Sequence, residues 1–466
     1  MKNIYRFLIP LLLVGLILFA GAPAGAAISV QCPGDYDGDA VWESALCSET
    51  PTVVCATSDN CPETRRCSVS SEVACSADGD CPDGEVCSGA ENLCTGAEIQ
   101  PPNTKCLHLT GGDGFIAVPD DDPTGWRSLY MFGFADVTGT PANQVMAKGA
   151  LAAEFAAPPI VLDEGDEFYL TLSNVGMVIR PDLFDPHTVH YHGFPESSNI
   201  FDGLPESGIS INMGASLTYY YLNNEPGTYM YHCHVEATEH MQMGMLGSLY
   251  VRPAQNGSSI GGFTQFAYND GDGSTGYDVE FALQVGAFDS AFHDASENVQ
   301  PLPFALMRDN YPMINGRGYP DTVGASTAAT GAPPAPPDAN PISGGTTQPV
   351  SSLVTATAGD RILLRLSNLD VTGYYTLASL GIPMKVVGKD AKLLRGPDGK
   401  DLYYTTNSVT MGGGESYDVI LDTTGVAAEA PYSTYFLYSA ALNFLNNNIE
   451  VSDGMGGMLT EIRITP

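Results

Sequence analysis

Six of the chain's eight histidines lie in two short stretches, DPHTVHYHG at 185–193 and HCHVEATEHMQMGM at 232–245. The second stretch also carries the cysteine Cys233 and three methionines. Imidazole, thiolate and thioether groups are metal ligands. Filling of a core does not explain such clustering in a chain with few histidines. We therefore predict that both stretches bind metal.

The softness of the available ligands indicates copper as the metal of one site. One thiolate, two imidazoles and a weak thioether make a trigonal copper site suited to electron transfer. Cys233, His240 and Met245 lie on one loop of the sequence, and His187 is the natural fourth ligand from another strand. Met243 is the alternative to Met245 as the axial ligand.

The four other histidines of these stretches follow strand geometry, in which successive side chains point to opposite faces. His190 and His192 therefore share one face. His232 and His234 also share a face, opposite to that of Cys233. We expect Cys233 to bind one copper while its two neighbours bind a second cluster, with the Cys233 backbone as the short path for electrons.

The motifs His-x2-His-x-His-Gly and His-Cys-His followed by His-x4-Met are similar to the copper signatures of multicopper oxidases. The resemblance covers about 110–466 and implies cupredoxin β-sandwich domains. By this resemblance the type 1 copper ligands are His187, Cys233, His240 and Met245. By the same resemblance, His190 is a type 2 copper ligand. The type 3 copper ligands are His192, His232 and His234. The catalytic electron relay implied by the family is Cys233, His232 and His234.

One departure from the family pattern lies in the ligand loop. The usual spacing from the cysteine to the next histidine is five residues, but Cys233 and His240 are seven apart. Because His240-x4-Met245 is kept, a two-residue insertion is the simplest interpretation.

Two regions of the chain are related in sequence. GDEFYLTLSN at 165–174 matches GDRILLRLSN at 359–368, and GMLGSLYVRP at 244–253 matches GMLTEIRITP at 457–466. Two copies of one Greek-key β-sandwich explain the match. The positions of the second copy that match the metal-binding residues of the first are Tyr375, Ala378, Leu380, Tyr438, Ser439 and Ala440. We therefore expect the second copy to bind no copper of its own.

The expected fold class is all-β, with two cupredoxin-like domains behind a small disulfide-rich segment. Residues 107–255 form the copper-binding domain and residues 256–466 the ligand-less domain, which contains a flexible Pro- and Gly-rich loop at 322–350. Ten of the eleven cysteines lie in residues 27–106, where Cys-x5-Cys-x5-Cys recurs after 20 residues. Few apolar residues occur there, so disulfides must replace a core. Cys233 is the odd cysteine left over.

The first 26 residues are typical of a secretory signal peptide, with a basic start, an apolar run and a small-residue cleavage site near Ala26. This predicts a protein of the periplasm or the cell exterior, without stable membrane insertion once the signal is removed. The net charge of −35 argues against nucleic acid as a partner. The negative charge attracts cations, so it weakly favours a metal cation as the reducing substrate.

The second cluster is only half present in one chain. By the resemblance, the cluster that reduces oxygen takes eight histidines, four from each of two domains. Two copies of the first domain, packed across a two-fold axis, could supply four each, so we expect a homo-oligomer that shares the cluster. His108 and His293 belong to no motif and are interpreted as surface or structural residues.

Together these features predict an exported oxidoreductase that oxidises a small-molecule or metal-ion reductant and reduces dioxygen. Two alternatives remain open. One is a type 1 copper electron-transfer protein that does not reduce oxygen. The other is a nitrite-reductase-like enzyme, which is less favoured because such an enzyme takes a histidine from its second domain and none follows His293.

Overall fold

We describe the chain from a computed structural model. The described residues are 28–35, 39–41, 103–120, 126–324, 347–447 and 456–466, with short stretches between 45 and 95. The expected signal peptide lies outside them, as does most of the expected flexible loop.

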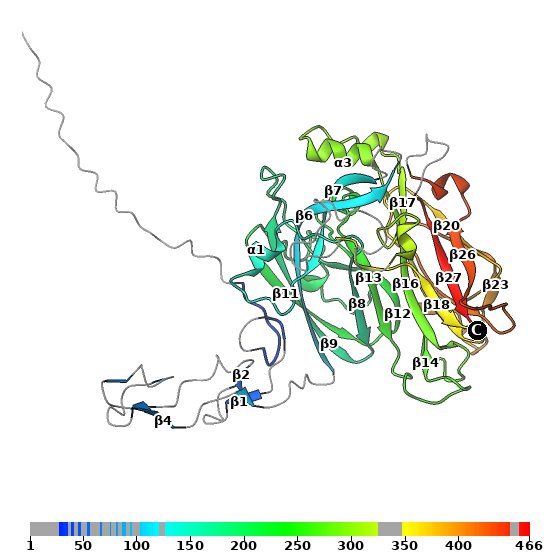
Figure 1. Cartoon of the computed structure of the whole chain (residues 1–466), viewed down its shortest axis with the longest axis horizontal. Coiled ribbons are helices and arrows are strands. Elements are labelled where there is room, and N and C mark those ends of the chain that lie inside the picture. Colours follow the sequence, from blue (N-terminus) through cyan, green and yellow to red (C-terminus); the bar gives the residue numbers. More distant parts are fainter. Residues whose placement is uncertain are drawn as a thin grey trace, which may run out of the picture.

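The first domain is a sandwich of two four-stranded sheets (Figure 1). One sheet has the order β11-β9-β6-β7, with strands Ser216–Asn223, Asp166–Gly176, Thr104–Pro119 and Trp126–Asp136. The other has the order β10-β12-β13-β8, with strands His190–His192, Gly227–His232, Leu246–Arg252 and Ala157–Asp163. The domain also has two short α-helices, α1 (Val145–Gly149) and α2 (Ala237–Gln242), and the 3-10 helix η3 (Asn199–Phe201).

The second domain repeats this plan with two larger sheets (Figure 1). The seven-stranded sheet has the order β17-β16-β19-β25-β21-β22, and β23 also pairs with β21. Its strands are Tyr311–Ile314, Val279–Phe288, Arg361–Asn368, Ser416–Asp422, Met384–Lys389, Lys392–Leu393 and Tyr404–Thr406. The five-stranded sheet has the order β18-β27-β26-β20-β24, with strands Val354–Thr357, Leu459–Thr465, Ser433–Ser439, Tyr375–Leu380 and Ser408–Met411. This part of the chain also has the hairpin β14–β15 (Gln265–Phe266 and Gly276–Tyr277), the helix α3 (Ser290–Glu297) and the 3-10 helices η4 (Phe304–Leu306), η5 (Asp321–Val323) and η6 (Leu442–Leu445).

The apolar pattern of the strands places a separate core inside each sandwich. In β27, for example, Thr460, Ile462 and Ile464 are buried while their neighbours are more exposed, which is the period-two pattern of a strand with one face on a core. The predicted all-β sandwich architecture is therefore confirmed.

Buried polar groups connect the two domains at strand β12. Thr228 on β12 donates a 2.6 Å hydrogen bond to Asp418 on β25. The guanidinium of Arg365 is fully buried and lies 3.4 Å from Asp418 and 3.0 Å from Glu280. A buried cation is tolerated when its charge is paired in this way. These contacts fix the second domain against the strand that leads to His232.

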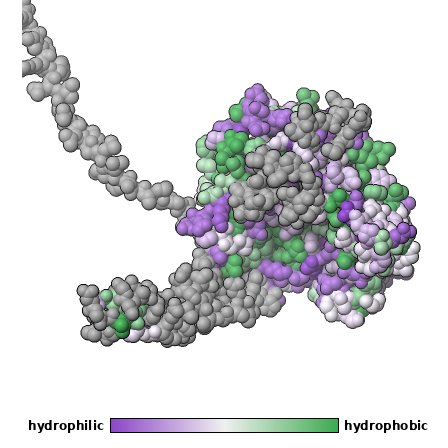
Figure 2. All heavy atoms as spheres, in the orientation of Figure 1, coloured by the Kyte–Doolittle hydropathy of each residue, from purple (hydrophilic) through white to green (hydrophobic). Residues whose placement is uncertain are grey.

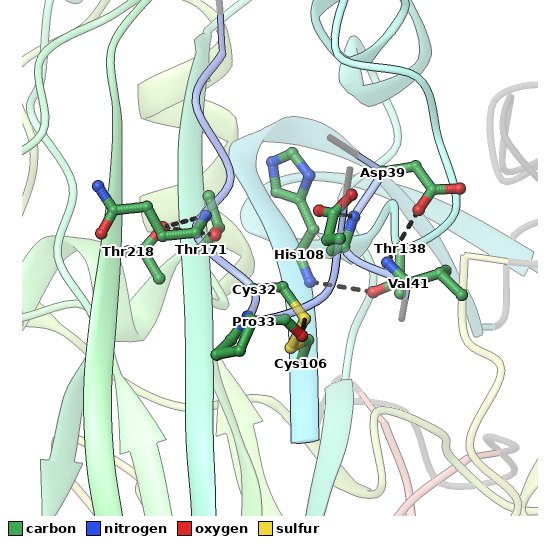
Figure 3. Close-up of a disulfide and its surroundings, with 12 residues drawn as sticks. Cys32, Pro33, Asp39, Val41, Cys106, His108, Thr138, Thr171 and Thr218 are labelled. Atoms are coloured by element: carbon green, nitrogen blue, oxygen red, sulfur yellow. Dashed lines mark hydrogen bonds between the residues drawn. A yellow bond between two sulfur atoms is a disulfide. The ribbon is translucent and has the colours of Figure 1, made fainter. Parts of the chain in front are cut away.

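The N-terminal segment is fastened to the first domain by a disulfide between Cys32 and Cys106 (Figure 3). Beside it, the amide of Gln31 donates to Thr218 Oγ1 at 3.2 Å. Cys67–Cys81 and Cys75–Cys87 are further disulfides. The five short strands β1 to β5 lie in this part of the chain, at Ala45–Cys47, Val54–Cys55, Arg66–Cys67, Cys87–Ser88 and Cys94–Thr95. The expectation that disulfides stabilise this segment is confirmed for these three pairs.

The described end of the expected flexible loop is packed rather than free. Thr347 is fully buried and donates a 2.7 Å hydrogen bond to the carbonyl of Phe115 in the first domain. Gln348 accepts from the amide of Ala117 at 3.2 Å. A composition rich in Gly and Pro does not reveal such docking, because single polar residues provide the contacts.

The surface is hydrophilic over much of the face in Figure 2, as expected for a chain with a net charge of −35. In the part of the chain that the structure describes, no helix has the length and apolar character needed to cross a bilayer.

Candidate metal centre

Three residues from separate elements converge beneath the surface of the first domain. His187 precedes β10 and is held by a two-way backbone pairing with Ile211, at 3.0 and 2.9 Å. Cys233 directly follows β12, and His240 lies on α2. Their ligand atoms all lie within 4.8 Å of one another, and Cys233 Sγ is 3.2 Å from His240 Nδ1. All three side chains are fully buried.

The chemistry of this group fits a metal ion. Both ring nitrogens of His187 are buried without a hydrogen-bond partner, which is costly unless they bind something else. Burial by itself would raise the pKa of the Cys233 thiol, but the adjacent His240 and His187 rings lower it well below its ordinary value. Burial also opposes the charge of His240, yet Cys233 and Asp185 raise the pKa of His240 to about 10. A buried thiolate beside two imidazoles is a soft donor set that suits copper.

The methionine candidates occupy different places around this group. A Cβ atom added at Gly111 would lie 2.9 Å from His187 Cδ2 and 3.3 Å from Met245 Cε, so these two side chains meet at one point. The amide of Met245 also donates to the His240 carbonyl at 2.8 Å, and its carbonyl accepts from Cys233 at 3.0 Å. Met243 is tied instead to β7, through a 2.9 Å bond from the Phe132 amide to its carbonyl. Met245, rather than Met243, is therefore the methionine that meets His187 beside this group.

Part of the stretch between Cys233 and His240 lies in a helix that continues past His240. Glu236 takes a left-handed conformation with φ of 45°, and α2 then runs from Ala237 to Gln242. The sequence predicted an insertion but no helix, because a six-residue segment is too short to show a helical period.

Four further histidines gather on the other side of the His232–His234 backbone. Strand pairing places His190 directly opposite His232, and their ring centroids are 5.2 Å apart. The ring of His234 is 5.1 Å from that of His190, and the ring of His192 is 5.8 Å from that of His232. The predicted division of side chains between the two faces is thus what the structure has.

Each of two histidines in this group has its Nδ1 atom engaged by a backbone carbonyl. His190 Nδ1 lies 2.5 Å from the carbonyl of Asp202, and His232 Nδ1 lies 2.8 Å from that of Cys233. A carbonyl only accepts, so Nδ1 carries the proton and Nε2 keeps its lone pair for a metal. Burial lowers the pKa of His190, and it lowers that of His232 to about 3. Both rings are therefore neutral, as ligands must be.

This second group opens into a cavity of about 430 Å³ between the two domains. The four histidines line one wall, and Asp370, Thr372 and Gly414 of the second domain line another. Within the described residues, no three of these four histidines bring ligand atoms within 4.8 Å of one another, in contrast to the His187, Cys233 and His240 group. The four rings therefore present separate ligands to a shared space.

The corresponding positions of the second domain form no such groups. Ala378 pairs with Tyr438 across β20 and β26, in the register that His190 and His232 have in the first domain. A cavity of about 470 Å³ remains there, lined in part by Leu380 and Ala440. The ligands that this domain was expected to lack are absent from these described positions.

His108 and His293 are not surface residues, which corrects half of the sequence interpretation. Both side chains are fully buried. His108 Nε2 lies 2.8 Å from Ser173 Oγ, and the ring of His293 lies between two backbone carbonyls. Neither residue belongs to the two histidine groups, so their packing could not be read from a motif.

Asp185 is a neighbour of the first group that the sequence interpretation passed over. Its Oδ2 atom is buried without a hydrogen-bond partner and lies 3.7 Å from His240 Nε2, which also has none. The carboxylate lies only two positions before His187, so the motif DPHTVH already held the signal.

Comparison with known proteins relates part of this chain to copper oxidases. Residues 136–256 match the multicopper oxidase family. Laccase-2 of Botryotinia fuckeliana is 24% identical over 341 residues, which cover 72% of this chain and 48% of that protein. Laccase 1 of Metarhizium acridum is 29% identical over 126 residues, which cover 26% of this chain and 19% of that protein. The chain thus spans less than half of the length of either relative.

Solved structures share the fold. The blue copper oxidase from Nitrosomonas europaea superposes with a TM-score of 0.54 at 20% identity, over 78% of this chain and 86% of that one. The multicopper oxidase mgLAC gives a TM-score of 0.53 at 20% identity, over the same shares of the two chains. The chain is thus similar to multicopper oxidases over residues 136–256, and it shares the fold of these solved structures.

Proposed function

We propose that this chain is an exported, copper-dependent oxidoreductase of the multicopper oxidase type, which oxidises a reductant and reduces dioxygen. The observation that supports it most is the alternation at His232–Cys233–His234. Cys233 points into the mononuclear group while both neighbours point into the four-histidine group. Two sites built for different ligand sets thus share one stretch of backbone.

The residues that would hold type 1 copper are His187, Cys233, His240 and Met245. The residues that would contribute to the type 2 and type 3 coppers are His190, His192, His232 and His234. Copper bound at these sites would change between its two oxidation states and so supply one-electron chemistry. The polypeptide supplies a buried thiolate, a covalent path from Cys233 to the flanking histidines, and, at His190 and His232, rings whose Nδ1 atoms are engaged by backbone carbonyls so that Nε2 is left for a metal.

The four-histidine group supports a cluster shared between subunits. Among the described residues no three of its rings bring ligand atoms within 4.8 Å of one another, so a complete cluster would need further ligands. A second copy of the first domain could present the same four histidines across a two-fold axis. The same shortage favours a second candidate function, a type 1 electron-transfer protein that does not reduce oxygen.

One experiment separates these functions. Copper content per chain, absorption and electron paramagnetic resonance spectra, and oxygen consumption are measured on full-length mature protein of known oligomeric state. An oligomer with more than one copper per chain, a thiolate-to-copper band and oxygen consumption is the expected result. A monomer with one copper per chain and no oxygen consumption would support the electron-transfer protein and contradict the shared cluster.

The reductant would be a small organic molecule or a metal ion. Asp185, which lies beside His240, is 18% exposed at its side chain and so is the nearer of the two to solvent. Steady-state oxygen consumption with phenols and with reduced metal ions, compared between the wild type and Asp185→Asn, tests which class is used. A larger loss with cations than with neutral phenols would assign the cation.

A further inference from the structure

The second domain sends one helix across to the ligand loop of the first domain. Helix α3 (Ser290–Glu297) lies against β7, as Figure 1 shows. The domain that contributes it has none of the metal-binding residues at the matching positions. Its contacts therefore raise the question of what this helix does for the site beside it.

Strand β7 is the outer strand of its sheet, so its free backbone groups need partners. The Phe132 amide donates to the Met243 carbonyl of the ligand loop at 2.9 Å. Two residues earlier, the Tyr130 carbonyl lies 2.6 Å from His293 Nδ1 on α3. The ligand loop and the helix thus cover the same strand edge next to each other.

His293 also reaches the ligand loop itself. Its Nε2 atom lies 3.0 Å from the carbonyl of Gln242, the last residue of α2. Carbonyls at the end of a helix lack partners within that helix, and this contact satisfies one of them when Nε2 carries the ring proton. Both neighbours of the ring are acceptors: a neutral ring donates to one of them in either tautomer, and a doubly protonated ring donates to both.

A second group from the same domain holds the side chain of Gln242. Its amide nitrogen donates to Asp309 at 3.4 Å, and the residue is only 2% exposed. Gln242 lies two positions after His240 and three before Met245. Residues of the second domain therefore contact both the backbone carbonyl and the side chain of Gln242.

Apolar packing adds to these polar contacts. Phe292, next to His293, is fully buried within the core cluster of the first domain, which also contains Met243 and Met245. His293 itself packs on Phe288, with ring centroids 4.3 Å apart. On the domain-1 side, Phe132 meets the His240 ring edge-on at 5.8 Å. The helix, the strand and the metal-binding ring therefore form one packed unit.

We propose that α3 of the second domain is a positioning element for the mononuclear site, with His293 as the residue that fixes the ligand loop through Gln242. The loop carries two of the mononuclear ligands within six residues, so its backbone sets their mutual geometry. A ligand-less domain thereby controls the site of its neighbour. This inference rests on the proposed function only in taking the loop to be a copper-binding loop.

The test uses the full mature chain and two variants on the same helix. His293→Phe keeps a ring against Phe288 but removes both ring nitrogens, and with them the N–H donor. Asp294→Asn is the matched control, because it weakens a different link from α3 to the first domain, the 2.5 Å ion pair with Arg127. Hydrogen exchange of amides 239–245 is measured on metal-free protein, and the thiolate-to-copper band and reduction potential on copper-loaded protein.

In His293→Phe we expect exchange of the loop amides to rise by roughly fivefold to tenfold, as for the loss of one buried hydrogen bond. The copper band and potential should shift as well. Asp294→Asn should leave all three readouts at wild-type values. Equal exchange and identical spectra in the two variants, at matched global stability, would overturn the proposal.

A milder variant covers the case in which His293→Phe does not fold. His293→Gln keeps one amide donor, so it should show loop exchange between the wild-type value and that of the Phe variant. Wild-type exchange together with a wild-type spectrum in His293→Gln would contradict the assignment. If the wild type binds copper without a thiolate band, the proposed function fails, while the exchange comparison on metal-free protein still decides the role of the helix.

Discussion

The two sandwiches of this chain share the same strand pairing, but only the first carries the histidine and cysteine side chains of the candidate metal centre. Ser439 donates its amide to the Met458 carbonyl at 2.9 Å, just as Cys233 donates to Met245 at 3.0 Å. Ala378 and Tyr438 pair in the register of His190 and His232. Strand pairing is fixed by backbone bonds and core packing, so it persists when the ligands are exchanged. The candidate metal ligands are therefore a small set of side chains on a framework that keeps its strand pairing without them.

Space is exchanged along with ligands. Gly111 pairs with Asn174 between the parallel strands β6 and β9, and Val285 pairs with the matching Asn368 between β16 and β19. Gly111 thus leaves space for the side chains of His187 and Met245. At the matching position of the second domain, which has no such histidine, Val285 fills the space. The four changes below test which of these differences matters, from the largest expected effect to the smallest.

Cys233→Ser gives the first domain the residue that the second domain has at the matching position, Ser439. We expect complete loss of the thiolate-to-copper band, because a hydroxyl does not replace a soft thiolate in copper binding. Absorption and electron paramagnetic resonance spectra of the full chain check this. Retention of the band would show that Cys233 is not the ligand, and Ser439→Cys is the matched control that should create no band.

His190→Ala gives the second histidine group the residue found at 378. We expect oxygen consumption to fall by roughly a hundredfold or more, since loss of even a supporting contact to a metal ligand costs 10–100-fold. The band of the mononuclear copper should remain, because Cys233 points to the other face. Ala378→His in the second domain is the control, and it should change neither readout. Unchanged oxygen consumption in His190→Ala would contradict a role for this group.

Asp309→Asn tests the polar group that surrounds Tyr375. This tyrosine occupies the position of the second domain that matches His187 of the first. The Tyr375 hydroxyl lies 3.3 Å from Asp309 and 3.2 Å from Asp370. Burial and then the Asp370 charge raise the pKa of Asp309 from 3.8 to about 7. The folded state therefore keeps a proton that the unfolded state releases, and the free energy of unfolding falls as pH rises from about 4 to about 7.

Asparagine cannot ionise, so Asp309→Asn should flatten this slope by an amount with an upper bound of about 4 kcal/mol across the window. Urea unfolding of the full chain at several pH values between 4 and 8 measures it. A variant with the wild-type slope would show that the proton resides elsewhere.

Gly111→Ala tests the space beside the mononuclear group. The new Cβ would lie 2.9 Å from His187 Cδ2, so we expect a loss of about 1 to 3 kcal/mol in the free energy of unfolding, as in other overpacked cores. The copper band should shift as well. Gly286→Ala is the control, because nothing lies within 4 Å of a Cβ at that position. Equal stability of the two variants would mean that His187 moves aside without cost.

Much of the site could be predicted because its signals are local. The spacing of His232, Cys233 and His234 assigns them to faces by the period of a strand alone. The repeat between GDEFYLTLSN and GDRILLRLSN predicts a second sandwich, and the resemblance of the motifs predicts its family. The helix α2 was missed since six residues are too few for a periodic signal. Asp185 was missed although DPHTVHYHG contains it, since only the histidines of that stretch were interpreted as ligands.

The burial of His293 could not be predicted for a different reason. Its contacts are with Tyr130 and Gln242, 163 and 51 residues away in the chain. Contacts at such separations depend on how whole domains pack, and no local periodicity records them.

The sequence by itself determined the ligand types, their division between two faces, the erased second copy and the surplus cysteine, because each depends on composition or on spacing of a few residues. Only the tertiary structure decided that His187 meets Cys233 and His240, that the four other histidines face a cavity bounded by the second domain, and that α3 grips the ligand loop. The physical reason is that burial and close packing select among long-range contacts that the local pattern leaves equally possible.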